Sequence, residues 1–421
     1  MNYPDSVHFL YALGNEIKTA KFGLERIRAV LEALGRPQDR CRFVHVAGTN
    51  GKGSTCAMIE SGLRAAGRRT GLFTSPHLAE PTERIRIDGQ PISDARFTDA
   101  FNRVHACVEG MLAAGKLDLH TTYFETVTAM AMLVFAEEAT DAVVLEVGLG
   151  GRLDATNVVA PLLCVVTPID FDHEAFLGKS IESIAGEKAG ILKAGVPAVF
   201  ARQRPEAMAV LEERAAALAV PVWRTADVAV RDVALTARGS SFVFGDLRIA
   251  CPLAGEHQVE NAQAAALALQ RLDVPAAAIE SGIAQARWPG RIEHVGAAPD
   301  IILDGAHNPA GARALAAYID RFYADRPVRL IYGAMRDKAV DEISGILFPR
   351  ARQVIVTAPR QTRALAPAAV REVAHHPDLR VASTLEDALA MVQDSRPEET
   401  IFITGSLFLV AEARAMLLHN G

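Results

Sequence analysis

The chain has 421 residues, of which 50% are hydrophobic and 22% charged, a balance typical of a globular protein with room for two or three domains. Its net charge of −6 excludes a general basic surface for nucleic acid, and no apolar run approaches the roughly 18 residues of a membrane span. The five cysteines are scattered without a Cys-x-x-Cys pair, and the N-terminus is unlike a signal peptide. We therefore expect a cytoplasmic protein with reduced thiols, no zinc site, and no nucleic-acid or membrane partner.

Apolar runs alternate with alanine- and leucine-rich helical segments in the first part of the chain. Continuous apolar runs, unlike alternating ones, indicate strands that are buried on both faces of a parallel sheet. A hairpin is expected over residues 84–92, turning at Asp88-Gly89, and short alternating strands over residues 222–253 predict a small antiparallel patch. The strands expected in the parallel sheet are residues 43–47, 142–147, 162–167 and 198–200.

A second α/β region begins near residue 298, after Pro289-Gly290 breaks the preceding helix. We expect a mostly parallel N-terminal α/β domain with the antiparallel patch (residues 1–288), a linker (289–299), and a smaller Rossmann-like α/β domain (300–421). The strands expected in this second domain are residues 300–303, 328–332, 353–356 and 400–404.

A glycine-rich loop, Gly48-Thr49-Asn50-Gly51-Lys52-Gly53-Ser54, joins the strand 43–47 to a helix expected over residues 55–63. Such loops wrap backbone N–H groups around phosphate, and a lysine reaches the outer phosphates. The spacing departs from the usual phosphate loop, because two residues rather than four precede Gly51-Lys52 and Gly53 separates Lys52 from Ser54. A simple strand–helix turn is the alternative, but such a turn has no need for Lys52. We therefore expect the N-terminal domain to be a P-loop-type ATPase domain.

Two polar residues follow strands that end at the same edge of the expected sheet. Glu146 closes the strand 142–147 and is a candidate Mg²⁺ ligand, with an ion pair to Arg152 as the alternative. His173 follows the next strand, and a structural histidine and a site histidine are equally consistent with the spacing alone.

Lys188 falls within an apolar helical stripe over residues 180–192. Sequence physics alone favours a lysine that buries its stem and extends its ammonium group to water. The alternative is a buried amine that loses its proton and adds CO₂ to become a carbamate, which could bind metal.

The second domain opens with Asp304-Gly305-Ala306-His307-Asn308-Pro309. Asn308 and Pro309 are explained as the N-cap and first residue of a helix. Asp304 and His307 have no such explanation and are therefore functional candidates, and Ser406, after the last strand, is a further one.

Together these segments resemble the folylpolyglutamate synthases, and more closely the bifunctional dihydrofolate synthase/folylpolyglutamate synthases of the Mur ligase superfamily. The motifs that carry the resemblance run in family order over nearly the whole chain: residues 45–54, 74–78, 83–87, 123–126, 146–157, 172–173, 186–191, 289–291 and 304–309. The variant Gly-Lys-Gly-Ser is the family's own form of the phosphate loop.

The resemblance implies an ATP-dependent ligase that adds L-glutamate to dihydropteroate and to reduced folates through an acyl phosphate. It implies ATP bound by Asn50, Gly51, Lys52, Gly53, Ser54, Thr55, Asn261, Arg291 and Asp304. It implies two Mg²⁺ ions held by Ser75, Glu146, His173 and carbamylated Lys188, which reverses the interpretation of Lys188 from sequence physics. It implies catalytic roles for Lys52, Lys188, His173, Asp304 and His307, and substrate contacts by Phe22, Gly23, Leu24, Thr122, Tyr123, Phe124, Glu125, Asp154, Ala155 and Ser406.

Other functions remain as alternatives. A cell-wall Mur ligase would need an N-terminal substrate domain, and only 47 residues precede Gly48. A nucleotide switch would carry an Asn-Lys-x-Asp motif, which we do not find, and a simple ATP-binding module would turn over ATP without a carboxylate or an amino acid. A folylpolyglutamate synthase without dihydropteroate activity is the nearest alternative. We expect a monomer whose two domains close around the substrates.

Overall fold

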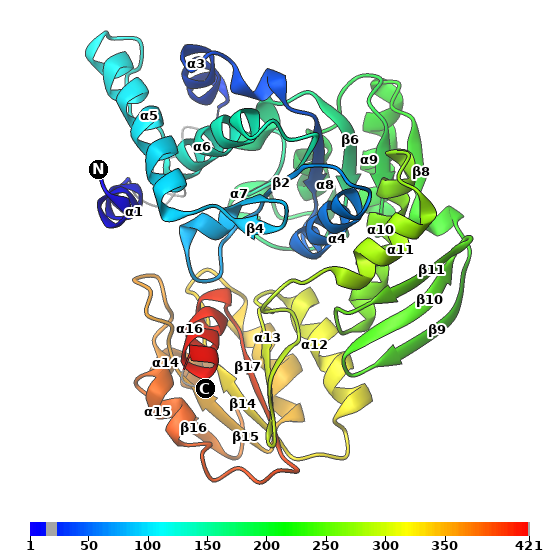
Figure 1. Cartoon of the computed structure of the whole chain (residues 1–421). Coiled ribbons are helices and arrows are strands. Elements are labelled where there is room, and N and C mark those ends of the chain that lie inside the picture. Colours follow the sequence, from blue (N-terminus) through cyan, green and yellow to red (C-terminus); the bar gives the residue numbers. More distant parts are fainter. Residues whose placement is uncertain (14–22, 420–421) are drawn as a thin grey trace. The chain divides into compact units, whose positions relative to one another are not determined.

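The computed structural model describes residues 1–13 and 23–419 and divides the chain into two compact units, drawn as a ribbon in Figure 1. Unit 1 comprises Met1–Ile169, Glu174–Ala229 and Glu260–Gln285, and unit 2 comprises Asp170–His173, Val230–Val259 and Ala286–Gly421. The expected domain bounds, residues 1–288 and 300–421, stay predictions, and the two units are made of other, discontinuous ranges.

Unit 1 is built on an eight-stranded sheet in the order β4-β3-β2-β5-β1-β6-β7-β8. All neighbours from β2 to β8 are parallel, whereas β3 and β4 form an antiparallel hairpin that turns at Asp88-Gly89, as predicted. The four strands expected from apolar runs are all present within a residue at each end. The strands are β1 (Phe43–Ala47), β2 (Thr70–Phe73), β3 (Ile85–Ile87), β4 (Gln90–Pro91), β5 (Ala142–Glu146), β6 (Pro161–Val166), β7 (Ala198–Phe200) and β8 (Val222–Arg224).

The helices of unit 1 pack on this sheet and on one another. Side chains of α1, α3, α5 and α6 form one core cluster with strand residues such as Phe43, Phe73 and Leu145, while α4 packs against β1, β2 and β5. The helices are α1 (Tyr3–Ala12), α3 (Glu25–Ala33), α4 (Lys52–Ala65), α5 (Asp94–Ala113), α6 (Tyr123–Glu137), α7 (Glu174–Leu177), α8 (Ile181–Ala189), α9 (Pro205–Ala217), α10 (Glu256–Arg271, which begins in unit 2) and α11 (Ala276–Gln285).

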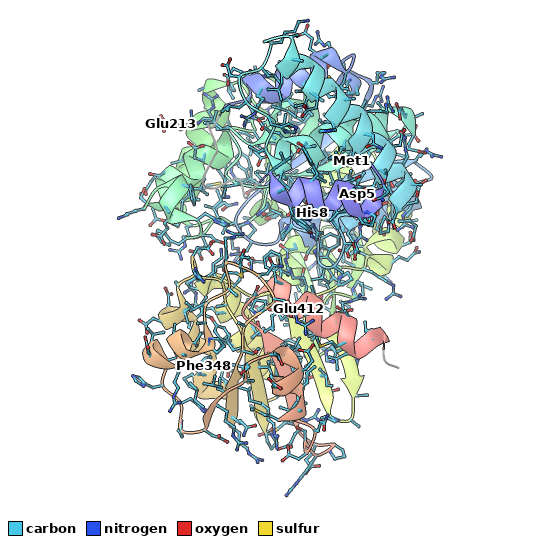
Figure 2. The ribbon with its side chains drawn as sticks, turned by 90° about the vertical axis from the view of Figure 1, so that its left-hand side faces the viewer. Met1, Asp5, His8, Glu213, Phe348 and Glu412 are labelled. Atoms are coloured by element: carbon cyan, nitrogen blue, oxygen red, sulfur yellow. The ribbon has the colours of Figure 1, made fainter. Side chains whose placement is uncertain are left out.

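Unit 2 contains a six-stranded sheet in the order β12-β13-β17-β14-β15-β16, in which only β12 is antiparallel to its neighbour. Its core includes Phe348, labelled in Figure 2, whose ring meets Tyr332 edge to face at 5.3 Å. The strands are β12 (Glu293–Ala297), β13 (Asp300–Asp304), β14 (Val328–Tyr332), β15 (Gln353–Val356), β16 (Leu379–Val381) and β17 (Thr400–Thr404), and the helices are α12 (Pro309–Phe322), α13 (Val340–Leu347), α14 (Pro367–Val373), α15 (Leu385–Ala390) and α16 (Leu407–His419).

The predicted antiparallel patch is a three-stranded sheet of β9 (Val230–Thr236), β10 (Gly239–Phe244) and β11 (Leu247–Cys251). It belongs to unit 2, where the Ala237 carbonyl oxygen lies 2.7 Å from the Tyr318 hydroxyl and 3.0 Å from His294 Nε2. The segment expected as a linker, residues 289–299, contains β12, and its role as the link between two domains stays a prediction.

All five cysteines are free thiols. Within the described part of the chain, no helix combines the length and the apolar character needed to cross a bilayer.

Candidate active site

The glycine-rich loop connects β1 to α4, which starts at Lys52 rather than at Thr55. Gly48 and Gly51 have φ angles of +148° and +83°, a region that favours glycine. A Cβ on Gly48 would lie 1.9 Å from Thr167 Oγ1, so this position also lacks space for a side chain. Asn50 and Gly51 therefore precede the helix, and Lys52, Gly53, Ser54 and Thr55 form its first turn. A helix N-terminus that follows glycines, whose backbone N–H groups no side chain covers, is suited to bind phosphate.

The side chains of Lys52 and Asn261 lie next to this loop. Lys52 Nζ donates to the carbonyl oxygens of Gly48 (3.1 Å) and Thr49 (3.0 Å), so the ammonium group stays over the loop. Asn261, from α10, is so close that a Cβ on Gly51 would meet its Oδ1 at 2.1 Å. The structure thus brings together the loop and Asn261, two of the predicted nucleotide contacts that are far apart in sequence.

Glu146 and Ser75 meet at the carboxyl edge of the unit 1 sheet. Glu146 is the last residue of β5 and is 4% exposed, and its Oε2 accepts from the Ser75 backbone N–H at 3.0 Å. Arg152 instead pairs with Glu187 at 2.7 Å, so the alternative of a Glu146–Arg152 ion pair is wrong. A buried carboxylate whose neighbour in space is a serine residue offers oxygen ligands of the kind that Mg²⁺ prefers.

Lys188 is buried on α8. Its side chain does not extend to water: the residue is 4% exposed and Nζ donates to the Gly48 carbonyl oxygen at 2.7 Å. The interpretation from sequence physics alone is therefore wrong, because the helix stripe packs against the phosphate loop rather than against solvent. Lys52 and Lys188 share this one acceptor, so two amine groups converge on the loop.

The residues expected to contact the pterin begin α6. Thr122 is the N-cap, and Glu125 completes a capping box and pairs with Arg26 at 2.7 Å. The Phe124 ring lies where a Cβ on Gly148 would meet it at 2.5 Å, just beyond the end of β5. Glu125 therefore has a sufficient structural role, whereas Phe124 lies at the carboxyl edge of the unit 1 sheet, where Glu146 ends β5.

The remaining residues predicted to contact the pterin differ in their hydrogen bonds and in their place in the fold. Asp154 accepts from the backbone N–H groups of Leu149 (2.8 Å) and Thr156 (3.0 Å), and burial raises its pKa. Its contacts within the fold are thus structural. Tyr123, Leu24 and Ala155 are each about 7% exposed, Gly23 precedes α3, and Phe22 lies outside the described residues.

In unit 2, Asp172 is the centre of a polar cluster. Asp172 Oδ1 accepts from Lys338 Nζ at 2.8 Å, and Oδ2 accepts from Asn308 Nδ2 at 3.1 Å. His307 Nε2 lies 3.7 Å from Asp172 Oδ2. Asn308 also caps α12, as predicted, by accepting from the Gly311 N–H at 2.8 Å. Sequence reasoning missed Lys338, whose only signal is a charged pair with Asp337 in a loop.

The charges of this cluster are set by its surroundings. Burial by itself would raise the pKa of Asp172, but the nearby His307 imidazole and the charge of Lys338 hold it well below its ordinary value. Burial lowers the pKa of His173 to about 4, so this imidazole is neutral at pH 7. A neutral ring nitrogen is the form that can accept a proton or bind a metal.

The other candidates of unit 2 follow β13 and β17. Asp304 accepts from the N–H groups of Ile292 (3.0 Å) and Ala306 (2.9 Å), and burial raises its pKa despite the opposing charge of Arg291. The expectation that Asp304 lacks a structural role is therefore wrong. His307 Nδ1 lies 2.8 Å from the Gly305 carbonyl oxygen, which orients Nε2 toward Asp172.

Ser406 is 2% exposed and accepts from the Phe408 N–H at 3.2 Å, at the start of α16. Its hydroxyl therefore has a capping contact, and a role toward substrate stays a prediction.

We expect Asp172→Asn to lower the free energy of unfolding at pH 7 by about 3–5 kcal/mol, because Lys338 then loses its buried partner. The folded-state pKa of Asp172 is depressed. Its stabilisation is thus complete above the unfolded-state pKa of about 3.9 and is lost as pH falls through the lower folded-state pKa.

Urea unfolding at several pH values measures this effect, and the gap between wild type and Asp172→Asn should narrow below about pH 4. Asp320→Asn, which removes an exposed pair with Arg350, should cost less than about 1 kcal/mol. A gap that stays constant down to pH 3 would contradict the assignment.

Two family models cover most of the chain. The Mur ligase middle domain matches residues 46–269, and the Mur ligase glutamate ligase domain matches residues 290–407. The chain is 37% identical over 416 residues to the dihydrofolate synthase/folylpolyglutamate synthase of Bacillus subtilis, covering 94% of this chain and 95% of that protein.

Solved structures agree with these matches. The folylpolyglutamate synthase of Mycobacterium tuberculosis, complexed with ADP and AMPPCP, has a TM-score of 0.92 and 34% identity, covering 99% of each chain. The Escherichia coli FolC structure with DHPP and ADP has a TM-score of 0.89 and 31% identity, covering 100% of this chain and 98% of that one. The chain therefore belongs to the folylpolyglutamate synthase/dihydrofolate synthase family of Mur ligases.

Proposed function

We propose that this protein is an ATP-dependent ligase that joins L-glutamate to dihydropteroate and to reduced folates through an acyl phosphate. The observation that carries the proposal is the convergence of Lys52, Lys188 and the glycine-rich loop at the sheet edge that also holds Glu146. The family relatives support it, since their names include both synthase activities and their structures contain ADP, AMPPCP and DHPP. A monomeric, cytoplasmic enzyme without nucleic-acid or membrane partners stays our prediction.

Unit 1 would bind ATP through the loop and the first turn of α4. Backbone N–H groups and the helix N-terminus would hold the β- and γ-phosphates. Lys52 would exchange its contacts with the Gly48 and Thr49 carbonyls for the γ-phosphate oxygens. This exchange requires no ion pair to be broken, because the present acceptors are backbone oxygens.

Glu146 and Ser75 fit a magnesium site, since a buried carboxylate and a serine lie together at the sheet edge. His173 would complete a second site as a neutral imidazole. Bound Mg²⁺ would supply the positive charge that lets two anions, the substrate carboxylate and the γ-phosphate, approach each other.

Lys188 would act as a carbamate. Burial disfavours a charged amine, and the neutral amine is the form that adds CO₂ and releases one proton. The product is a carboxylate, so a hydrogen-bond donor beside Gly48 would become an acceptor and a metal ligand.

The pterin ring of the substrate would contact Phe124, Tyr123 and the segment at Gly23 and Leu24. The carboxylate at the other end of the substrate would attack the γ-phosphate to give the acyl phosphate and ADP. Buried apolar side chains at this edge would exclude water, which would otherwise hydrolyse that intermediate.

Unit 2 would supply the groups that handle glutamate. Its amine would attack the acyl carbon, forming the amide bond and releasing phosphate. His307 Nε2, oriented by Gly305 and facing Asp172, is placed to accept the proton that the amine loses. Arg291 and Ser406 would contact the nucleotide and the glutamate.

We expect the purified enzyme to release ADP with dihydropteroate and with a tetrahydrofolate, in each case only when L-glutamate is present. A coupled ADP assay, with product masses checked by mass spectrometry, measures both activities. Glutamate-dependent ADP release with the tetrahydrofolate but not with dihydropteroate would show that the enzyme only extends folates. ADP release that ignores both carboxylate and glutamate would instead indicate a simple ATPase and contradict the ligase proposal.

A further inference from the structure

Three potential metal ligands gather on unit 1, away from the residues assigned above. His105 and Glu109 lie four residues apart on α5, which places them on one helix face, and His120 lies in the segment before α6. One ligand atom from each falls within 4.8 Å of the others. Glu109 Oε1 lies 3.6 Å from His120 Nε2 and 4.0 Å from His105 Nδ1.

The two ring nitrogens that face Glu109 are buried without a hydrogen bond. Neither His105 Nδ1 nor His120 Nε2 has a hydrogen-bond partner among the described residues. Buried polar atoms rarely lack a hydrogen-bond partner, so two such nitrogens side by side require an explanation. Both distances to Glu109 exceed a hydrogen bond but leave space for an ion between the three atoms.

The tautomer of His120 suits a metal ligand. Its Nδ1 lies 2.9 Å from the Thr121 carbonyl oxygen, an acceptor that requires Nδ1 to carry the hydrogen. Nε2 therefore presents its lone pair toward Glu109. A backbone carbonyl on the second nitrogen is the usual partner of a metal-binding histidine.

Aromatic packing fixes both rings. His105 stacks on Phe101 with centroids 5.5 Å apart and a 10° interplanar angle, and its centroid is 4.7 Å from that of Phe9. The same Phe9 ring lies 5.5 Å from His120. The two imidazole rings are therefore held by α1 and α5 before any ion binds.

We propose that His105, Glu109 and His120 form a binding site for Zn²⁺, with water as the fourth ligand. Zinc bonds of about 2.0–2.1 Å at a tetrahedral angle place ligand atoms about 3.4 Å apart. The two separations from Glu109 Oε1, 3.6 and 4.0 Å, are near this value, and all three ligand atoms lie within 4.8 Å of one another, so the site would contract on binding zinc. Two imidazoles and a carboxylate suit zinc better than magnesium or calcium. The expectation of no zinc site came from the cysteines, and this site uses none of them.

Zinc at this position would tie α5 to the segment 114–121, which leads directly into the Thr122–Glu125 capping box of α6. Metal binding would therefore order the chain immediately before Tyr123 and Phe124. This effect is separate from the ligase chemistry and would be present in an inactive enzyme.

The test is a titration of the full-length, metal-stripped protein with ZnCl₂ in excess Mg²⁺, so that sites built from oxygen ligands are filled. We expect one zinc ion per chain at this site, and Glu109→Gln should weaken its binding at least about tenfold, as changes around metal ligands do. Asp99→Asn is the matched control, because Asp99 and Glu109 lie on the same helix with side chains equally exposed at 54%. His120→Asn should also remove the site, whereas the exposed His8 of α1, labelled in Figure 2, should tolerate the same change.

Two further readouts do not depend on activity. Co²⁺ in place of Zn²⁺ should give the visible absorption of a four-coordinate site in wild type but not in Glu109→Gln. Zinc should also slow amide hydrogen exchange over residues 114–121. Equal zinc affinity in wild type, Glu109→Gln and Asp99→Asn would overturn the proposal, and this result remains decisive even if His120→Asn fails to fold.

Discussion

Lys52→Ala is expected to reduce ADP release by at least about 10²–10³-fold while leaving the fold intact, because the variant removes a charged contact with the transferring phosphoryl group. In the structure Lys52 Nζ contacts only backbone oxygens of its own loop among the described residues. Its removal therefore leaves no buried charge unpaired, and stability should change little. Turnover is measured by the coupled ADP assay, and folding by circular dichroism and thermal unfolding.

Lys179→Ala provides the control, since Lys179 is exposed and has no proposed role. It should retain wild-type turnover. A well-folded Lys52→Ala variant with nearly normal turnover would remove the glycine-rich loop from the mechanism.

Lys188→Ala is expected to have an effect of similar size, for a different reason. The variant removes the group that would become a carbamate, and with it a ligand to the proposed metal site. Short carboxylates such as acetate should restore part of the activity by occupying the space that the side chain leaves. Lys188→Met, which keeps most of the volume, should be inactive and should not be rescued.

Carbamylation itself can be followed without activity. Wild-type protein equilibrated with ¹³C-bicarbonate should show a carbamate carbon signal by NMR, and Lys188→Met should lack it. A wild-type spectrum without this signal, together with no rescue of Lys188→Ala, would refute the carbamate.

The buried strands could be predicted from sequence because burial on both faces leaves a direct compositional trace. β1 and β5 are continuous apolar runs, buried at every position. β2 (Thr70–Phe73) and β16 (Leu379–Val381) were missed, since they are short and contain Thr, Gly or Arg. β12 was hidden in a segment whose Pro-Gly pair suggested a linker, although Pro-Gly lies just before the strand.

The site was predictable where a local pattern carries the chemistry and not where it depends on distant partners. The loop at Gly48 has its own spacing, and Glu146 ends an apolar run. Nothing near Lys338 indicates that it contacts Asp172, a residue 166 positions away. Whether Lys188 reaches water depended on what packs against α8, which a helical stripe cannot reveal.

The discontinuity of the two units has a consequence for any attempt to divide the protein. The chain passes between them after residues 169, 173, 229, 259 and 285. A break within residues 289–299 would therefore leave Asp172 on one fragment and its partners Asn308 and Lys338 on the other. Separately produced fragments should be poorly folded alone and should recover order, and any activity, only by complementation when they are refolded together.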